Sequence, residues 1–183
     1  MAEIRDAEVT IVGGGAIGCA VAYALTRAGH RDIQVVEQGE LAGATSGQAA
    51  GLVGQVRASP ERCLLAMASV AAYARIEQET GYPADWRQTG SVRIAMTAAR
   101  AAEFRALAAV ARSAGLEVEF LTAARLAELC PMLDTTGVTA ALWCPTDGYL
   151  QPNSLVTVVR VANVAPRSRA ARAYAITRLL GWR

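Results

Sequence analysis

The hydrophobic pattern of the first forty residues consists of two short apolar runs on either side of an alanine-rich stretch. Residues 8–12 (EVTIV) and 33–37 (IQVVE) are rich in β-branched side chains, which is typical of buried strands in a parallel sheet. Residues 16–28 have a helical composition, and Gly29 follows them as a suitable helix end. The order strand, helix, strand predicts a βαβ unit.

Longer helical patterns follow. Ser59 suits an N-cap and Pro60 a first helical position, so we expect a helix from there to about Thr80 and Gly81. Its apolar residues are expected to lie in the core: Leu64, Leu65, Met67 and Ala68. The remaining predicted elements are a strand over 90–96, a helix over 98–114, a strand over 118–121, a helix capped by Thr122 that ends before Pro131, a strand over 138–143, a turn over 145–148 and a helix from about Asn153.

A glycine-rich loop joins the first predicted strand to the first predicted helix. Gly13 permits a tight turn, Gly15 lets the backbone approach a pyrophosphate, and Gly18 lets the helix pack closely. The helix start also offers free N–H groups and a partial positive charge, which suit a diphosphate, and Ala16 and Ile17 would supply these donors. The loop therefore predicts a dinucleotide-binding site.

Glu37 and the segment after it favour FAD among the dinucleotides. Glu37 ends the second strand, where a carboxylate accepts hydrogen bonds from a ribose and repels a 2′-phosphate, so NADP is disfavoured. Residues 41–53 are small, hydroxyl-bearing and glycine-rich, which suits a large ligand better than the second helix of an NAD-binding unit would. Thr45 and Ser46 are expected to cap a helix that faces phosphate. An NAD-dependent dehydrogenase, or a plain surface loop over 41–53, remains the alternative.

Three further segments carry a family resemblance. Residues 43–57 (GATSGQAAGLVGQVR), 86–95 (WRQTGSVRIA) and 147–155 (DGYLQPNSL) resemble, in the same order, segments of the D-amino-acid-oxidase superfamily of FAD-dependent oxidoreductases. The likeness is to the dimethylglycine and sarcosine dehydrogenase group and covers about residues 7–157. It implies FAD as cofactor and a secondary or tertiary amine or amino acid as substrate.

The resemblance also implies which residues contact the cofactor. Together with the loop residues, the expected FAD site is Gly13, Gly15, Ala16, Ile17, Gly18, Glu37, Gln38, Ala44, Thr45, Ser46, Gly47, Gln48, Ala49, Ala50, Gly51 and Leu52. Gln48 stands where mammalian-type members of the group have a histidine bonded covalently to the flavin, so we expect non-covalent FAD. No catalytic residue can be assigned.

Three arginines are candidates for binding a substrate carboxylate, because a guanidinium can grip a carboxylate with two hydrogen bonds. They are Arg57, Arg87 and Arg93, in the part that the resemblance assigns to a sheet over the flavin. The alternative for each is an ordinary surface arginine. Trp86 and Trp143 are expected in the core or an interface rather than around a substrate.

Composition restricts the other functions. An apolar fraction of 53% with 19% charged residues indicates a soluble globular protein, and no run approaches the ~18 apolar residues of a membrane span. The first residues do not read as a signal peptide, so a cytoplasmic location is expected. Four cysteines without a CxxC pair and the single histidine, His30, do not suggest a metal site or a histidine-based triad.

The C-terminal segment differs from the rest. All 18 basic residues are arginine; 12 lie in residues 1–159 with all 16 acidic residues, and 6 lie in 160–183. The segment has no interleaved aromatic pattern, so no nucleic-acid partner is expected. Beyond about Val158 it also lacks helical amphipathicity and a following strand, and the arginine bias fits out-of-frame translation of a GC-rich gene.

We therefore predict an incomplete α/β fold. Residues 1–58 would form the start of a Rossmann-like FAD-binding domain, 59–157 part of an α+β substrate domain, and 158–183 an atypical tail. A truncated or frame-shifted product is expected, whose two-stranded sheet would have an unpaired edge. The predicted function is an FAD-dependent amine oxidoreductase acting on a small molecule, with an unidentified electron acceptor. The alternative is a non-catalytic fragment that binds FAD weakly or not at all.

Overall fold

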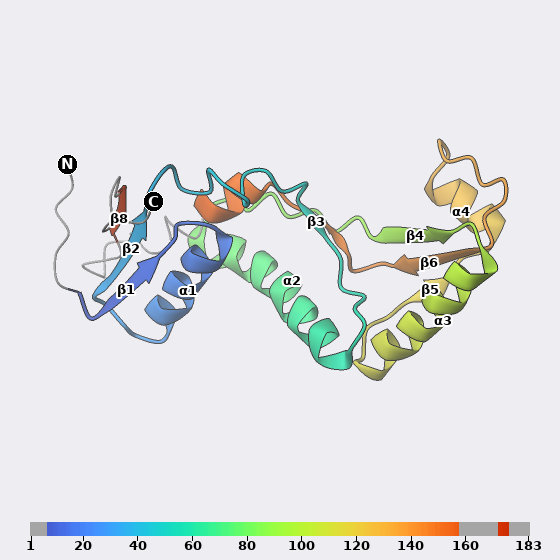
Figure 1. The fold of residues 1–183 in the computed structure, drawn as a ribbon, viewed down its shortest axis with the longest axis horizontal. Helices are drawn as coiled ribbons and strands as arrows, with labels where there is room; N and C mark the ends of the chain where they lie inside the picture. The colour runs from blue at the N-terminus through green and yellow to red at the C-terminus, as the bar shows by residue number, and fades with distance from the viewer. Residues whose placement is uncertain (1–6, 158–171, 176–183) are drawn as a thin grey trace, which may run out of the picture. The chain divides into compact units, whose positions relative to one another are not determined.

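The computed structural model describes residues 7–157 and 172–175, and they belong to two units (Figure 1). The first unit comprises Met1–Gly51, Tyr73–Trp86 and Leu150–Arg183, and the second comprises Leu52–Ala72 and Arg87–Tyr149. The units thus alternate along the chain, whereas the expected division was linear, at 58 and 157.

The first unit contains the predicted βαβ arrangement. Strand β1 (Val9–Val12), helix α1 (Ala16–Arg27) and strand β2 (Ile33–Glu37) follow in order, and β1 pairs with β2 in parallel (Figure 1). Four of the five β2 residues are buried, as expected of a strand covered on both faces. A right-handed crossover through a helix is the usual way to join parallel neighbours, and the short loops here leave α1 packed against both strands.

The third strand of this sheet was not predicted. Strand β8 (Arg172–Ala175) pairs in parallel with β2, giving the order β1-β2-β8. The predictions of a two-stranded sheet and of a tail without a strand are therefore wrong. Parallel pairing uses the backbone N–H and C=O groups that nearly every residue carries. Four residues can therefore join a sheet even when their sequence has no apolar pattern that would predict a strand.

Helix α1 ends as its glycine predicts. Gly29 has φ +98°, a conformation that a side chain disfavours. The Gly29 N–H donates to the Thr26 carbonyl and the His30 N–H to the Leu25 carbonyl, both at 3.1 Å, which is the Schellman pattern. The turn lets the chain reverse into β2, where Ile33 and Val35 pack with Ala22 of α1.

Helix α2 (Pro60–Thr80) begins and ends where predicted. The Ser59 hydroxyl accepts a hydrogen bond from the Arg62 N–H, and Gly81 follows the helix with φ +70°. The expectation that Leu64, Leu65, Met67 and Ala68 form core is wrong for all but Met67, since Leu65 is 70% exposed and Leu64 and Ala68 are also exposed. The buried side chain of this turn is Cys63. The stripe of the helix that the described residues cover is narrower than its apolar composition suggests.

The last turns of α2 belong to the first unit and are joined to α1 by polar contacts. The Tyr23 hydroxyl donates to the Glu79 carboxylate. Arg27 of α1 and Arg75 of α2 lie 3.4 Å and 3.6 Å from Glu79. Around them Cys19, Ile76 and Val156 are buried together, so α1 rests on a helix from far along the chain.

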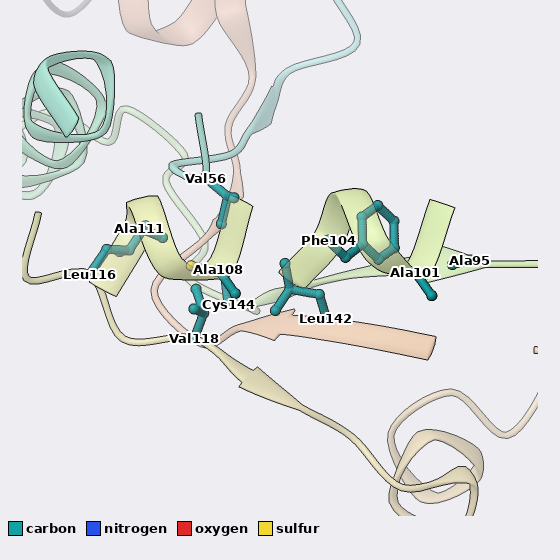
Figure 2. Close-up of a cluster of buried hydrophobic side chains, with 10 residues drawn as sticks. All are labelled: Val56, Ala95, Ala101, Phe104, Ala108, Ala111, Leu116, Val118, Leu142 and Cys144. Carbon is teal, nitrogen blue, oxygen red and sulfur yellow. The ribbon is translucent and has the colours of Figure 1, made fainter. Parts of the chain in front are cut away.

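The second unit is built on an antiparallel sheet. Strands β4 (Ser91–Ala95), β6 (Ala140–Cys144) and β5 (Glu119–Phe120) pair in the order β4-β6-β5, and helix α3 (Ala98–Ser113) covers one face (Figure 1). Thr97 caps α3 by accepting from the Arg100 N–H. Figure 2 shows the core between helix and sheet, whose buried members are Val56, Ala95, Ala101, Phe104, Ala108, Ala111, Leu116, Val118, Leu142 and Cys144.

Four smaller elements complete the described part. Thr122 caps helix α4 (Ala123–Leu129) as predicted, and residues 152–157 are helical. Strands β3 (Leu52–Val53) and β7 (Gly148–Tyr149) form an unpredicted antiparallel pair. None of the described helices is both long enough and apolar enough to cross a membrane.

The two phenylalanines of the chain test the importance of this core. Phe104 is 1% exposed and Phe120 is 39% exposed. We predict that Phe104→Ala lowers the unfolding free energy of the second unit by about 3–5 kcal/mol, because it removes a large side chain and leaves a cavity. Phe120→Ala, the matched control, is expected to cost less than about 1 kcal/mol. Urea unfolding followed by circular dichroism measures both, and equal losses would contradict the described core.

Candidate functional site

The turn between β1 and α1 is held by two glycines. Gly13 has φ +107°, and its N–H donates to the Val36 carbonyl at 2.7 Å, so the loop leaves the sheet directly over β2. A Cβ on Gly18 would overlap the Gly13 carbonyl oxygen, a backbone atom that has no freedom to move aside. Gly18 therefore permits the first turn of α1 to lie against the end of β1, as predicted.

Glu37 anchors the same loop from the end of β2. Its Oε2 accepts from the Gly14 N–H at 2.7 Å, and its Oε1 accepts from the Gly39 N–H at 3.0 Å. The backbone hydrogen bond from Gly14, followed by that from Gly39, lowers the pKa of Glu37 below its usual 4.5, so the carboxylate is ionised at neutral pH. A Cβ on Gly14 would overlap the end of the Leu41 side chain, which would have to move to make room for it.

Ser46 caps the cofactor helix. Gly15, the N-cap residue of α1, has no side chain to satisfy the first N–H groups. The Ser46 hydroxyl oxygen accepts from the Ala16 N–H at 3.0 Å instead, and a Cβ on Gly15 would lie 3.0 Å from that oxygen. The prediction that Thr45 and Ser46 cap a helix of their own is wrong, because residues 41–48 form successive turns and the serine serves α1.

The small-residue segment is compact because its glycines allow close backbone contacts. Ala42 adopts φ +60°, and its N–H donates to the Gly14 carbonyl at 3.1 Å. A Cβ on Gly47 would overlap the Ala42 carbonyl oxygen. Gly51, with φ +75°, receives a hydrogen bond from the Leu150 N–H at 2.9 Å. The segment is thus folded back onto the glycine loop.

Most residues of the expected cofactor site are exposed to solvent. Ile17 on the first turn of α1 is 82% exposed. The expected cofactor residues outside the turn itself are also exposed, namely Gln38, Ala44, Thr45, Gly47, Gln48, Ala49, Ala50 and Leu52. Ser46 is half-buried and Gly51 is buried. The first unit therefore presents a helix N-terminus, a carboxylate and a small-residue segment on accessible surface, which together can receive a nucleotide diphosphate.

The second unit contains a buried carboxylate that the sequence did not indicate. Asp147 is 0% exposed. Its Oδ1 accepts from the Gln55 backbone N–H at 2.8 Å and from Gln55 Nε2 at 3.1 Å, and its Oδ2 accepts from the Ser91 hydroxyl at 2.6 Å. A turn residue is ordinarily exposed, so only the pairing of β3 with β7 reveals that this one faces inward.

Two of the three candidate arginines lie beside this carboxylate. Arg57 Nη1 and Arg93 Nη2 donate to the same acceptor, the Val56 carbonyl, at 3.0 Å and 2.9 Å. The position that a Cβ on Gly54 would take lies 3.5 Å from Asp147 Oδ2, 3.6 Å from Arg57 Nη1 and 3.7 Å from Arg93 Nη2. Arg87 is exposed, and its backbone pairs with Tyr149 instead.

Other reactive side chains have structural roles. Burial, the largest cause, raises the pKa of Cys144 to about 11, so its thiol is protonated at neutral pH and is no nucleophile. Trp86 packs with Tyr73, and Trp143 lies against Gly90. His30 lies 3.1 Å from Glu8. Over the described ranges, no group of histidine, cysteine or acidic residues could hold a metal ion.

These features define a dinucleotide-binding α/β protein, and comparison with known proteins gives the family. The model of the FAD dependent oxidoreductase (DAO) family matches residues 8–174. The chain belongs to this family, whose cofactor is FAD, and the resemblance inferred from the sequence is confirmed. The match extends into β8, so the expectation that the chain leaves the family pattern near residue 158 is wrong.

Relatives and solved structures agree. The 4-methylaminobutanoate oxidase (formaldehyde-forming) of Paenarthrobacter nicotinovorans is 36% identical over 154 residues, 84% of this chain and 19% of that protein. Mitochondrial dimethylglycine dehydrogenase of Mus musculus is 34% identical over 154 residues, again 84% of this chain, and 18% of that protein. The L-proline dehydrogenase structure from P. horikoshii shares the fold with a TM-score of 0.84 at 22% identity, covering 93% of this chain and 44% of the other. The chain therefore spans under a fifth of these two relatives.

Ser46 provides a test of the first unit. We predict that Ser46→Ala lowers the stability of α1 by about 1 kcal/mol, because the Ala16 N–H loses its acceptor. Thr45→Ala is the control, since the Thr45 hydroxyl makes no hydrogen bond to the residues described. Thermal unfolding and amide exchange in α1 report the change. If both variants behaved like the parent chain, Ser46 would not be the cap.

Glu37 gives the site a pH dependence with a defined sign. Because its pKa is lowered in the folded chain, its contribution to stability is complete above about pH 5 and is lost as the pH falls from 4.5 through the folded-state value. Glu37→Gln is expected to flatten this part of the stability profile. Urea midpoints from pH 6 to 3 measure it, with Glu40→Gln as the control. If Glu37→Gln lost as much stability between pH 6 and 3 as the parent chain, Glu37 would not be the source of the pH dependence.

Proposed function

We propose that this chain carries the FAD-binding part of an oxidoreductase that acts on N-methylated amino acids. The observation that carries the proposal is the turn from Gly13 to Gly18, held by Glu37 and capped by Ser46, in a chain that belongs to an FAD-dependent family. An NAD-dependent dehydrogenase loses its support, since only the glycine loop favoured it.

The residues of the turn fit the adenine dinucleotide part of FAD. The N-terminus of α1 offers N–H groups and partial positive charge to the pyrophosphate. Because Ser46 accepts from Ala16, its own hydroxyl hydrogen is available to a phosphate oxygen, while Ile17 would donate its N–H. Each Glu37 oxygen accepts one backbone hydrogen bond and retains a lone pair for a ribose hydroxyl. Glu37 would therefore hold both the loop and the ligand.

The flavin would be held without a covalent bond through residues 44–52. Gln48 is exposed, and its side-chain amide has no nucleophilic nitrogen comparable to that of histidine. Small residues on both sides of it leave the backbone accessible. Affinity would then depend entirely on hydrogen bonds and packing, which makes the geometry of the turn decisive.

The substrate class is supported by the relatives and by the second unit. The two relatives are named for 4-methylaminobutanoate and dimethylglycine, each of which has an N-methyl group and one carboxylate. FAD, when bound, would accept the two electrons and the hydrogen removed from a carbon next to the substrate nitrogen. Arg57 and Arg93 would bind the carboxylate and orient the amine, because each has guanidinium donors beyond the one that meets Val56.

Titration with FAD tests the proposal. We predict saturable binding of FAD by the 183-residue chain, seen as quenching of flavin fluorescence, and affinity for FAD well above that for NADH. Gly18→Ala should weaken FAD binding by at least about tenfold, because the new Cβ displaces the Gly13 carbonyl from the turn. Gly39→Ala is the control, since its Cβ would lie 4.0 Å from the nearest atom.

The same preparation separates catalysis from binding alone. Loss of flavin absorbance on anaerobic addition of dimethylglycine or sarcosine supports an oxidoreductase, whereas FAD binding without bleaching supports the non-catalytic alternative. Absence of FAD binding, or preference for NADH, would contradict the assignment.

A further inference from the structure

The cluster around Gly54 contains three charged groups, two positive and one negative. Arg57 and Arg93 each bring one positive charge to the Val56 carbonyl, and Asp147 brings one negative charge, its Oδ2 lying 3.5 Å from the position that a Cβ on Gly54 would take. Among residues 7–157 and 172–175, neither guanidinium forms a salt bridge with a carboxylate. The cluster therefore retains one positive charge, and guanidinium donors remain available next to it.

Asp147 lies close enough to influence the charge of this cluster, but it is too deeply buried to contact a ligand. Its carboxylate is fully buried and accepts three hydrogen bonds from Gln55 and Ser91. Those bonds hold the backbone at Gln55. The next residue is Val56, whose carbonyl accepts hydrogen bonds from both Arg57 and Arg93. A buried carboxylate needs charge compensation, which the two nearby guanidinium groups supply. The same contacts therefore fix where the two arginines meet.

We propose that Asp147 is a positioning and charge-setting residue for a carboxylate site made by Arg57 and Arg93. The negative charge of Asp147 offsets one of the two positive charges. The site then suits a ligand with one carboxylate better than a ligand with two. The inference rests on the proposed function for the identity of the ligand, a monocarboxylate amino acid. It assigns specificity to a residue that cannot itself contact the substrate.

Arginine modification tests the site without FAD. Phenylglyoxal reacts with accessible guanidinium groups, and peptide mass spectrometry measures the labelling rate at each arginine. Acetate, as the monoanion, and succinate, as the dianion, are expected to slow labelling of Arg57 and Arg93, which share the Val56 carbonyl, but not of the exposed Arg87, whose described hydrogen bonds are made by its backbone to Tyr149. No protection of Arg57 and Arg93 by acetate would overturn the proposal, whether or not the chain binds FAD.

Asp147→Asn tests the charge. An asparagine retains an oxygen for Gln55, and Ser91 can reverse its hydroxyl to accept from the new amide, so the hydrogen bonds survive while the charge is lost. The preference for succinate over acetate should rise by about fivefold, because the dianion gains one more unit of attraction at a partly exposed site. Ser91→Ala is the control for the charge. It removes a hydrogen bond to Asp147 but no charge, so protection by both acids should weaken together while the succinate-to-acetate preference stays at the parent value.

A second variant tests the proposal independently of the folding of Asp147→Asn. Arg93→Gln leaves the cluster with no net positive charge and alters a half-buried side chain on β4. Acetate should then protect Arg57 about fivefold less well. Unchanged protection in Arg93→Gln, or an unchanged succinate preference in Asp147→Asn, would show that the cluster is structural only.

Discussion

The contact between Gly18 and the Gly13 carbonyl is the constraint on which the cofactor end of the molecule depends. It allows α1 to start directly at the end of β1, so that the helix N-terminus and the carboxyl end of β2 lie together. Glu37 can then reach the Gly14 N–H, and Ser46 can reach the Ala16 N–H. A larger residue at position 18 would displace the turn and with it both of these hydrogen bonds.

The elements of the fold were predictable where their signals are local. The β-branched strands, the proline and serine at the start of α2, the threonine caps of α3 and α4, and Gly29 after α1 each act within a few residues. Strand β8 and the β3–β7 pair have no such signal. Strand β8 pairs with residues more than a hundred positions earlier, and the β3 and β7 partners are 95 or more positions apart. Exposure of Leu64 and Leu65 likewise depends on what lies over the helix.

The candidate site divides in the same way. The spacing of Gly13, Gly18 and Glu37 has a direct physical meaning and could be interpreted from the sequence. The role of Ser46 could not, because its hydroxyl serves a helix thirty residues earlier. Arg57 and Arg93 were recognised as candidates, but Asp147 was not, since nothing in a Pro-Thr-Asp-Gly turn indicates that the aspartate is buried and hydrogen-bonded to Gln55 and Ser91.

In the proposed function, the turn from Gly13 to Gly18 receives the pyrophosphate of FAD. Amide NMR of the chain during addition of FAD tests this most directly. We expect the largest shifts at Gly15 and Ile17, a shift at Ser46, and little change in α3. Binding that left the amides of the turn unchanged, or that shifted mainly the second unit, would contradict it.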